Sequence, residues 1–260
     1  MDNPDVTPPA DPDHSGRVVL VTGGTKGIGL AIAGRYAAAG ATVVACGRTE
    51  PAPGTVPGDF VACDVRDPER VDALVGTVVE RFGRLDVAVN NAGGGPAADS
   101  ATASPRFTEA VIRLNLLAPM FVAQAAYRVM EEQDGGGAIV NIASVSGVRP
   151  SPRTAAYGAA KAGLLNLTQT LAVEWAPRVR VNAVVAGLVL TEESRPHYGD
   201  DAAIQRVGAT VPLGRMATPG DVAGACLWLS SPLAAYVSGA ALTVHGGGER
   251  PGYMAALGGG

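Results

Sequence analysis

The chain has 260 residues, of which 47% are hydrophobic and 17% charged, and its formal net charge is −4. This length allows one large domain or two small ones, and the scattered Lys and Arg residues give no basic surface for nucleic acid. No apolar run approaches the roughly 18 residues that span a bilayer, so we expect no membrane partner.

Residues 1–15 are acidic and proline-rich, which predicts a disordered tail and not a signal peptide. Residues 249–260 are expected to form a partly flexible extension. Between them, residues 16–248 contain no linker and no repeat, so we predict a single domain. The three cysteines lack the spacing of a zinc site and leave an odd number for disulfides, so we expect no metal site and a reducing, cytoplasmic location.

From Arg17 onward, short β-branched runs alternate with longer segments of helical periodicity. In chain order we predict a strand at 17–22, a helix at 28–40, strands at 41–47 and 59–65, a helix at 68–82, a strand at 85–90, a helix at 105–130, a strand at 137–144, a helix at 154–175, a strand at 178–185, a helix at 219–229 and a strand at 241–244. The strands are apolar on both faces, as in parallel sheets covered by helices on both sides. We therefore predict an α/β fold with a Rossmann-like, doubly wound parallel sheet of about seven strands, whose ligands sit beyond the carboxyl ends of the strands.

The segment TGGTKGIG, residues 22–29, joins the first predicted strand to the first helix. Its spacing, Gly23-x-x-x-Gly27-x-Gly29, differs from the G-x-G-x-x-G fingerprint but follows the same physics. Gly23 permits the sharp turn, and the other glycines let backbone N–H groups and a helix N-terminus approach a pyrophosphate. Glycines that serve only to form a turn could have the same spacing, but their position between the first strand and the first helix of an α/β chain favours dinucleotide binding.

The end of the second strand bears on which dinucleotide is bound. A carboxylate there would bind the adenosine ribose and repel a 2′-phosphate. This chain instead reads Cys46-Gly47-Arg48, with no carboxylate before Glu50. Arg48 and Lys26 are placed to face the ribose, which favours NADP(H), with NAD(H) as the alternative if both are solvated surface charges.

Tyr157 and Lys161 stand at positions i and i+4 of a predicted helix, in the segment YGAAK. They therefore project from the same side. A cation beside a phenol stabilises the phenolate, so we expect the pKa of Tyr157 to fall towards neutrality. Tyr157 is then suited to act as general acid in carbonyl reduction and as base in the reverse reaction. We expect Gly158, Ala159 and Ala160 to leave room for nicotinamide and substrate.

Taken together, the motifs resemble the short-chain dehydrogenase/reductase family from Arg17 to about Gly248. The matching text is TGGTKGIG at 22–29, CDV at 63–65, NNAG at 90–93, Asn115, Ser144 and YGAAK at 157–161. The resemblance implies an NAD(P)-dependent oxidoreductase that acts on CH–OH groups and interconverts a small-molecule secondary alcohol and a ketone by hydride transfer.

The resemblance also implies roles for individual residues. Ser144 would orient the substrate oxygen, Asn115 would hold a water that passes protons to Lys161, and Lys161 would also bind the nicotinamide ribose. Taken singly, Ser144 is more often a strand-end cap and Asn115 a buried amide satisfied by the backbone. The implied catalytic set is Asn115, Ser144, Tyr157 and Lys161. The implied cofactor contacts are Gly23, Thr25, Lys26, Gly27, Ile28, Gly29, Arg48, Asp64 and Val65 at the adenine, Asn91, Ala92, Gly93, Tyr157, Lys161, Gly187, Val189 and Thr191.

Three features depart from the family pattern. Ala186 stands where a proline is usual, which would soften the hinge of the following loop, and His245 stands where aspartate is common and is expected to be structural. The proline-rich stretch between Arg48 and Asp59 is too short for the usual helix, so we expect an open adenine side.

Substrate choice is expected to lie in the loops after Gly93, Ser144 and Gly187, and residues 188–214 are expected to form a lid. A 3-oxoacyl-acyl-carrier-protein reductase is one alternative, but it needs a basic docking patch, whereas the long helix ends in EEQD. A cofactor-binding regulator without turnover is another, although the catalytic set is intact. The resemblance further implies a homotetramer, or a homodimer, paired through the 105–130 and 154–175 helices.

Overall fold

The computed structural model describes residues 11–250. Seven strands form one parallel sheet in the order β3-β2-β1-β4-β5-β6-β7. They are β1 (Val18–Thr22), β2 (Thr42–Gly47), β3 (Asp59–Ala62), β4 (Val87–Asn90), β5 (Gly137–Ser144), β6 (Val179–Ala186) and β7 (Ala241–Val244). The chain runs outward from β1 to β3, returns to β4 and runs outward to β7. This order confirms the predicted doubly wound sheet, with its switch point between β1 and β4.

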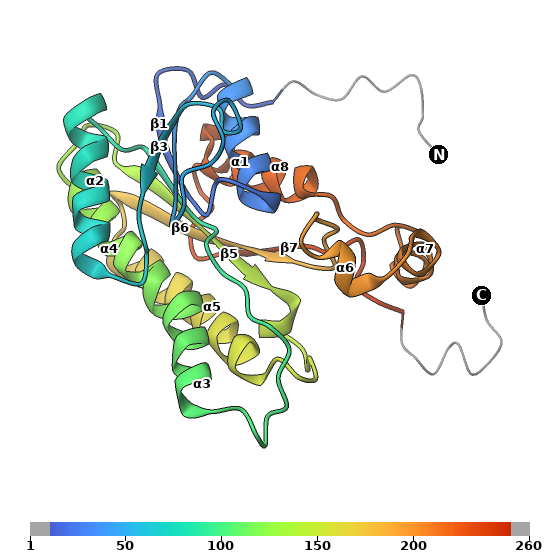
Figure 1. Cartoon of the computed structure of the whole chain (residues 1–260). Helices are drawn as coiled ribbons and strands as arrows, with labels where there is room; N and C mark the ends of the chain where they lie inside the picture. Colours follow the sequence, from blue (N-terminus) through green and yellow to red (C-terminus); the bar gives the residue numbers. More distant parts are fainter. Residues whose placement is uncertain (1–10, 251–260) are drawn as a thin grey trace, which may run out of the picture.

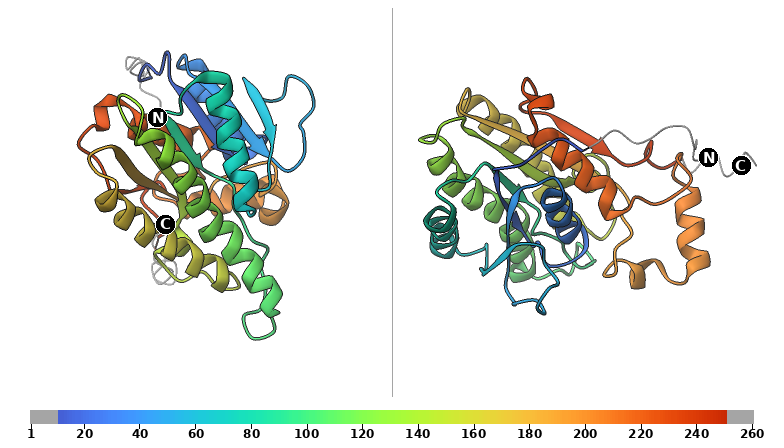
Figure 2. Two further views of the ribbon diagram at one scale, coloured as in Figure 1. Left: turned by 90° about the vertical axis from the view of Figure 1, so that its left-hand side faces the viewer. Right: turned by 90° about the horizontal axis from the view of Figure 1, so that it is seen from above.

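Helices cover both faces of the sheet (Figures 1 and 2). One face carries α1 (Gly27–Ala38) and α8 (Pro219–Ser230), and the other carries α2 (Pro68–Phe82), α4 (Ala118–Met130) and α5 (Ala155–Glu174). Alternate residues of one strand serve opposite faces, because Val19 and Val21 pack under α1 and α8 while Leu20 packs under α2 and α4. The apolar runs of the sequence are therefore explained by burial on both sides.

Local signals fix where the helices begin. The carboxylate of Asp67 accepts hydrogen bonds from the first turn of α2, and Pro68 follows it in this turn. Thr218 and Asp221 form a reciprocal capping box at the start of α8. These caps position two helices that flank the sheet.

The predicted 105–130 helix is interrupted by a π-helical turn. The order is α3 (Pro105–Ile112), the π turn η1 (Arg113–Leu117) and α4. The amide N–H of Ala118 donates to the carbonyl of Arg113, and Pro119 has no N–H to offer to Asn115, four residues earlier. Such turns often occur at functional sites, and this one holds Asn115.

Among the described residues, one stretch, Pro105–Met130, has the length and the hydropathy (1.3) of a helix able to cross a membrane. Its α4 part lies on the sheet, where Ala118, Val122 and Ala126 are buried in the core. A buried core helix meets the same two criteria, so length and composition alone are weak evidence here.

The predicted disordered tail reaches too far into the chain. Asp11 forms an ion pair with Arg35, and the fully buried His14 hydrogen-bonds to Ser230 at 3.0 Å and packs edge-on against Tyr36. Residues 11–15 are therefore ordered, because an imidazole finds buried partners that composition does not reveal. Residues 1–10 of the tail, and 251–260 of the predicted extension, lie outside the described residues.

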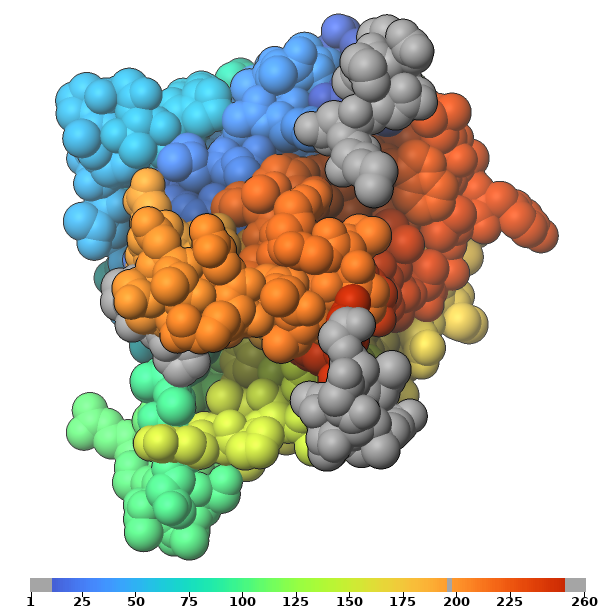
Figure 3. Space-filling view, turned by 90° about the vertical axis from the view of Figure 1, so that its right-hand side faces the viewer, coloured from blue at the N-terminus to red at the C-terminus, as the bar shows by residue number. Residues whose placement is uncertain are grey.

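The segment predicted as a lid contains two helices, α6 (Arg195–Tyr198) and α7 (Asp201–Ala209). Figure 3 shows this segment (orange) lying between the N-terminal part (blue) and the part around residues 100–150 (green). Short 3-10 turns follow β5, at η2 (Val145–Gly147), and α8, at η3 (Pro232–Ala234). Residues 48–58 contain turns, bends and irregular structure, and no helix links β2 to β3.

We expect Thr218→Ala to lower the free energy of unfolding by about 1 kcal/mol, because it removes the hydroxyl that accepts a hydrogen bond from the amide N–H of Asp221 in the α8 capping box. Equilibrium urea denaturation measures this loss. Thr218→Ser keeps the hydroxyl and is expected to retain most of the stability. Equal stability of the alanine and serine variants would show that the cap contributes nothing.

Candidate active site

A cleft of about 340 Å³ opens at the carboxyl ends of the central strands, beside the switch point between β1 and β4. It gathers most of the predicted site residues from distant parts of the sequence. These are Gly23, Lys26, Gly27, Ile28, Gly29, Asn91, Ala92, Gly93, Ser144, Tyr157, Lys161, Gly187, Val189 and Thr191. Thr25, Arg48, Asp64, Val65 and Asn115 do not line this cleft.

The glycine loop permits close backbone approach. Gly23 and Gly27 have φ angles of 62° and 52°, which glycine adopts readily. A Cβ on Gly29 would overlap the carbonyl oxygen of Gly23. The first N–H groups of an α-helix have no intrahelical acceptors, and no side chain caps α1 at Lys26. Unpaired donors at a helix N-terminus beside a cleft suit a pyrophosphate.

The two cations predicted to face the adenosine ribose are engaged differently. Arg48 is exposed at the end of β2, near enough to Asp64 to help lower the pKa of that carboxyl. Arg66 is the main cause, because it hydrogen-bonds to Asp64 and brings this pKa to about 2. Lys26 forms an ion pair with Glu193 instead of standing free.

The remaining predicted adenine-side residues lie near these cations. Thr25 lies against Gly47, where its Cγ2 would be 3.4 Å from an added Cβ. Val65 is buried, next to Asp64.

Ser144 ends β5 and lies beside Tyr157, in the first turn of α5. Its hydroxyl accepts a hydrogen bond from the amide N–H of Ser146 at 3.2 Å, so it caps η2. Burial raises the pKa of Tyr157, and a hydrogen bond with Ser144 partly offsets this rise. Ser144 therefore combines the capping role with contact to the phenol.

Lys161 is nearly fully buried, and its ammonium Nζ donates to the carbonyl oxygen of Ile142 at 2.7 Å. Burial lowers the pKa of Lys161 to about 8. Nζ lies 5.7 Å from the centroid of the Tyr157 ring. The prediction that this cation lowers the pKa of Tyr157 is wrong for this structure, because burial governs both groups and the ammonium is bound to a backbone carbonyl.

Two of the three small residues between Tyr157 and Lys161 serve packing within the protein, which corrects part of our expectation. A Cβ on Gly158 would lie 2.8 Å from the carbonyl oxygen of Ser146, and Ala160 is fully buried. Gly158 and Ala160 allow η2 to pack directly on α5, whereas Ala159 lines an apolar pocket beside Tyr157.

The fully buried side chain of Asn115 is satisfied by the backbone. Its Nδ2 donates to the carbonyls of Gly94 and Val111 at 2.8 and 2.9 Å, and its Oδ1 accepts from the amide of Gly94 at 2.8 Å. A Cβ on Gly93 would lie 2.8 Å from this Oδ1 and 3.3 Å from Nζ of Lys161. The side chains of Asn115 and Lys161 thus both approach Gly93. The backbone carbonyl of Asn115 lacks its usual helical donor, because Pro119 has no N–H.

A buried polar chain that the sequence did not reveal supports α5. Nδ2 of Asn90 donates to Oδ1 of Asn141, and Nδ2 of Asn141 donates to Oγ1 of Thr168, both at 2.9 Å. These three side chains are almost fully buried and tie β4 and β5 to the helix that carries Lys161. Polar residues within apolar strands were the available signal.

The cleft also contains residues that we had not assigned to it. Glu193, Ser194 and Tyr198 line it, from the segment expected to form a lid. Ala186 ends β6 and pairs with Ser144 at the end of β5. His245 packs against Gly187, because a Cβ added to Gly187 would lie 2.6 Å from the Cβ of His245.

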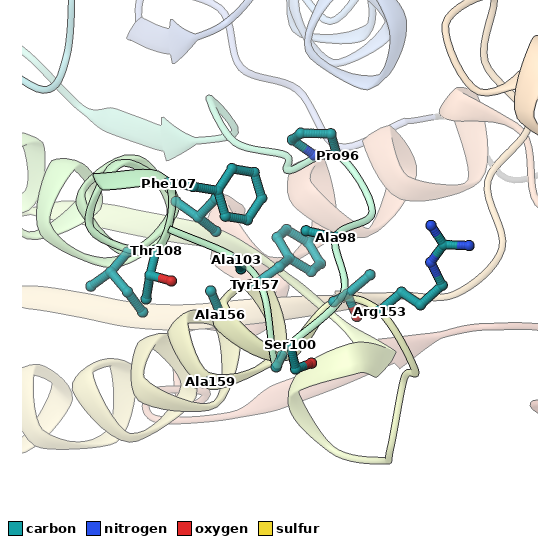
Figure 4. A pocket seen from close by; sticks show the side chains of 14 residues that line it. Pro96, Ala98, Ser100, Ala103, Phe107, Thr108, Arg153, Ala156, Tyr157 and Ala159 are labelled. Carbon is teal, nitrogen blue, oxygen red and sulfur yellow. The ribbon is translucent and has the colours of Figure 1, made fainter. Parts of the chain in front are cut away.

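A second pocket of about 340 Å³ lies against Tyr157 (Figure 4). Its lining is mostly apolar, with Pro96, Phe107 and Ala159, and Arg153 at its edge extends away from the other labelled side chains. Neither Ser144 nor Lys161 lines it. The polar groups that gather around Tyr157 therefore belong to the first cleft.

Comparisons with known proteins agree with this geometry. A family model described as enoyl-(acyl carrier protein) reductase matches residues 23–249. The chain is 38% identical over 246 residues to 3beta-hydroxysteroid dehydrogenase 1 of Eggerthella lenta, covering 90% of this chain and 94% of that protein. It is 36% identical over 245 residues to L-rhamnose 1-dehydrogenase (NAD(P)(+)) of Azotobacter vinelandii, covering 89% and 96%.

A solved structure is similar over the same extent. Ligand-free aldohexose dehydrogenase of Thermoplasma acidophilum superposes with a TM-score of 0.87 at 30% identity, covering 92% of this chain and 96% of that one. The chain therefore belongs to the short-chain dehydrogenase/reductase family, as a nicotinamide-dependent oxidoreductase that acts on the alcohol and ketone groups of small molecules.

Proposed function

We propose that this protein is an NADP(H)-linked oxidoreductase that interconverts a small-molecule secondary alcohol and a ketone, with Tyr157 as its general acid and base. One observation carries this proposal: Ser144, Tyr157 and Lys161 line the same cleft as the glycine loop. The nicotinamide cofactor, when bound, supplies or accepts the hydride. The protein's own residues then have to bind, orient and transfer a proton.

In ketone reduction, the hydroxyl of Ser144 orients the substrate oxygen and the phenol of Tyr157 donates a proton to it. Burial favours the protonated phenol, which suits the acid role at neutral pH. Alcohol oxidation needs the reverse transfer, in which Tyr157 accepts the proton. The ammonium group of Lys161, which is charged at neutral pH and lines the same cleft, would bind the nicotinamide ribose beside this reaction.

Asn115 has a defined place in the same proposal. Its side chain forms two hydrogen bonds with the backbone of Gly94. Its backbone carbonyl has no donor at position 119, because Pro119 lacks an N–H. A water held on this carbonyl would lie near Lys161 and relay a proton from solvent, which replaces the proton that Tyr157 gives up.

Arg48 supports the NADP(H) preference, because it is an exposed cation at the end of β2 with no carboxylate on that strand end. NAD(H) is the second candidate, and a specific observation favours it. Lys26 is paired with Glu193, and Arg48 acts on Asp64, so both cations are partly compensated.

We infer a free alcohol or ketone as substrate, and not an acyl carrier protein, because an acidic protein needs a basic surface at the cleft and the exposed lysine that lines this cleft, Lys26, is paired with Glu193. We also infer a cytoplasmic homotetramer or homodimer paired through η1–α4 and α5. Leu117 and Val173, on these elements, are 39% and 81% exposed, which supports such pairing.

We expect Tyr157→Phe to reduce turnover by at least about 100-fold, because it removes the proton donor and leaves the ring in place. A screen of ketones and alcohols followed by nicotinamide absorbance measures turnover. The matched control is Tyr236→Phe, at a fully exposed tyrosine outside the cleft. Full activity of Tyr157→Phe on every turned-over substrate would refute the assignment.

We expect Arg48→Ala to weaken NADPH binding about tenfold and to leave NADH binding unchanged, because only NADPH carries the 2′-phosphate. Fluorescence titration gives both dissociation constants. Arg106→Ala removes an exposed arginine from α3 and controls for net charge. Tighter binding of NADH by the wild type, together with a silent Arg48→Ala, would favour the second candidate.

We expect kcat/KM for ketone reduction to be constant near neutral pH and to fall above about pH 8. Lys161 loses its charge above this pKa, whereas the phenol of Tyr157 stays protonated because its own pKa is raised. The pH profile of Lys161→Met is expected to lack this decline. An identical decline in the variant would assign it to another group.

A further inference from the structure

A tight turn at residues 191–194 lies over the cofactor cleft and is held by its own hydrogen bonds. The amide of Thr191 donates to Oγ of Ser194 at 2.8 Å, and the amide of Ser194 donates to Oγ1 of Thr191 at 3.0 Å. Oγ of Ser194 also contacts the carbonyl of Val189 at 3.0 Å. The backbone position of Glu193, within this turn, is therefore fixed.

This turn contacts the glycine loop at two points. A Cβ on Gly27 would lie 3.5 Å from Cγ2 of Thr191, so the turn packs directly on the loop. One residue earlier, the ammonium of Lys26 is paired with the carboxylate of Glu193. The ion pair thus joins the two sides of the cleft next to the N-terminus of α1.

The charge of Glu193 is unfavourable for the expected ligand. A dinucleotide carries negative phosphates, which the unpaired N–H groups of α1 attract. Of the described residues that line the cleft, Glu193 alone has a carboxylate. It repels the phosphates and also occupies Lys26, the lining residue at the N-cap of α1.

We propose that Glu193 limits cofactor affinity by competing with the phosphate groups of the dinucleotide for the ammonium of Lys26. Binding exchanges one anionic partner of Lys26 for another and leaves the carboxylate of Glu193 to solvent. Both side chains are more than 60% exposed, at 63% and 61%, so the exchange is accessible and sensitive to salt. This inference rests on the proposed function, because it assumes that a nicotinamide dinucleotide enters this cleft.

The test compares Glu193→Gln with Glu192→Gln, titrating each with NADPH and with NADH. Glu192 is the matched control because it is the exposed neighbouring carboxylate, the charge change is identical, and no ion pair of Glu192 occurs among the described residues. We expect Glu193→Gln to bind cofactor about fivefold more tightly than the wild type, whereas Glu192→Gln changes affinity less than about twofold. The gain is expected to shrink at high ionic strength.

A second arm repeats Glu193→Gln in a Lys26→Met background. If Glu193 competes for Lys26, most of the gain in cofactor affinity is expected to disappear in this background, because the ammonium group is absent. Equal gains in both backgrounds, or equal effects of Glu193→Gln and Glu192→Gln, would overturn the inference while leaving the proposed function intact. A gain with NADPH alone would place Lys26 at the 2′-phosphate, and a gain with both would place it at the pyrophosphate. Failure of every variant and of the wild type to bind either cofactor would overturn the proposed function, and this inference with it.

Discussion

The hydrogen bond from the buried ammonium of Lys161 to the carbonyl of Ile142 is the interaction on which the site depends. A charge so far from water is costly unless it is well bound, so this contact locks α5 against β5. With α5 held on β5 in this way, Tyr157 lies beside Ser144, and both residues line the cleft. Burial also sets the acid–base character of the pair, since it favours the neutral form of each group.

Close backbone approach is the second constraint, and three of the glycines that provide it lie around the site. Gly29 lies against the carbonyl of Gly23, Gly158 lies against that of Ser146, and Gly93 lies between Asn115 and Lys161. Each contact joins two segments that are distant or differently directed. A methyl group at any of them would force the glycine loop, the helix or the π turn to shift.

The exposed cations at the open side of the cleft have carboxylate neighbours, whereas the buried ammonium of Lys161 is bound to a backbone carbonyl. Near the glycine loop, Lys26 forms an ion pair with Glu193, and Arg48 lies near enough to Asp64 to lower the pKa of its carboxyl. Cofactor affinity therefore depends on the exchange of ionic partners and not on cations alone. The same turn that carries Glu193 also contacts the glycine loop, so this side of the cleft is shaped by both packing and charge.

The sequence by itself determined the order of strands and helices and most of the residues that line the cleft, because hydrophobic periodicity, caps and short motifs are local properties. Tertiary structure alone decided the electrostatics, since i, i+4 spacing puts Tyr157 and Lys161 on one side of a helix but says nothing of burial or of the carbonyl of Ile142. It also decided that His14 is ordered and that Glu193 reaches Lys26, because each of these residues finds its partner more than a hundred residues away in the chain.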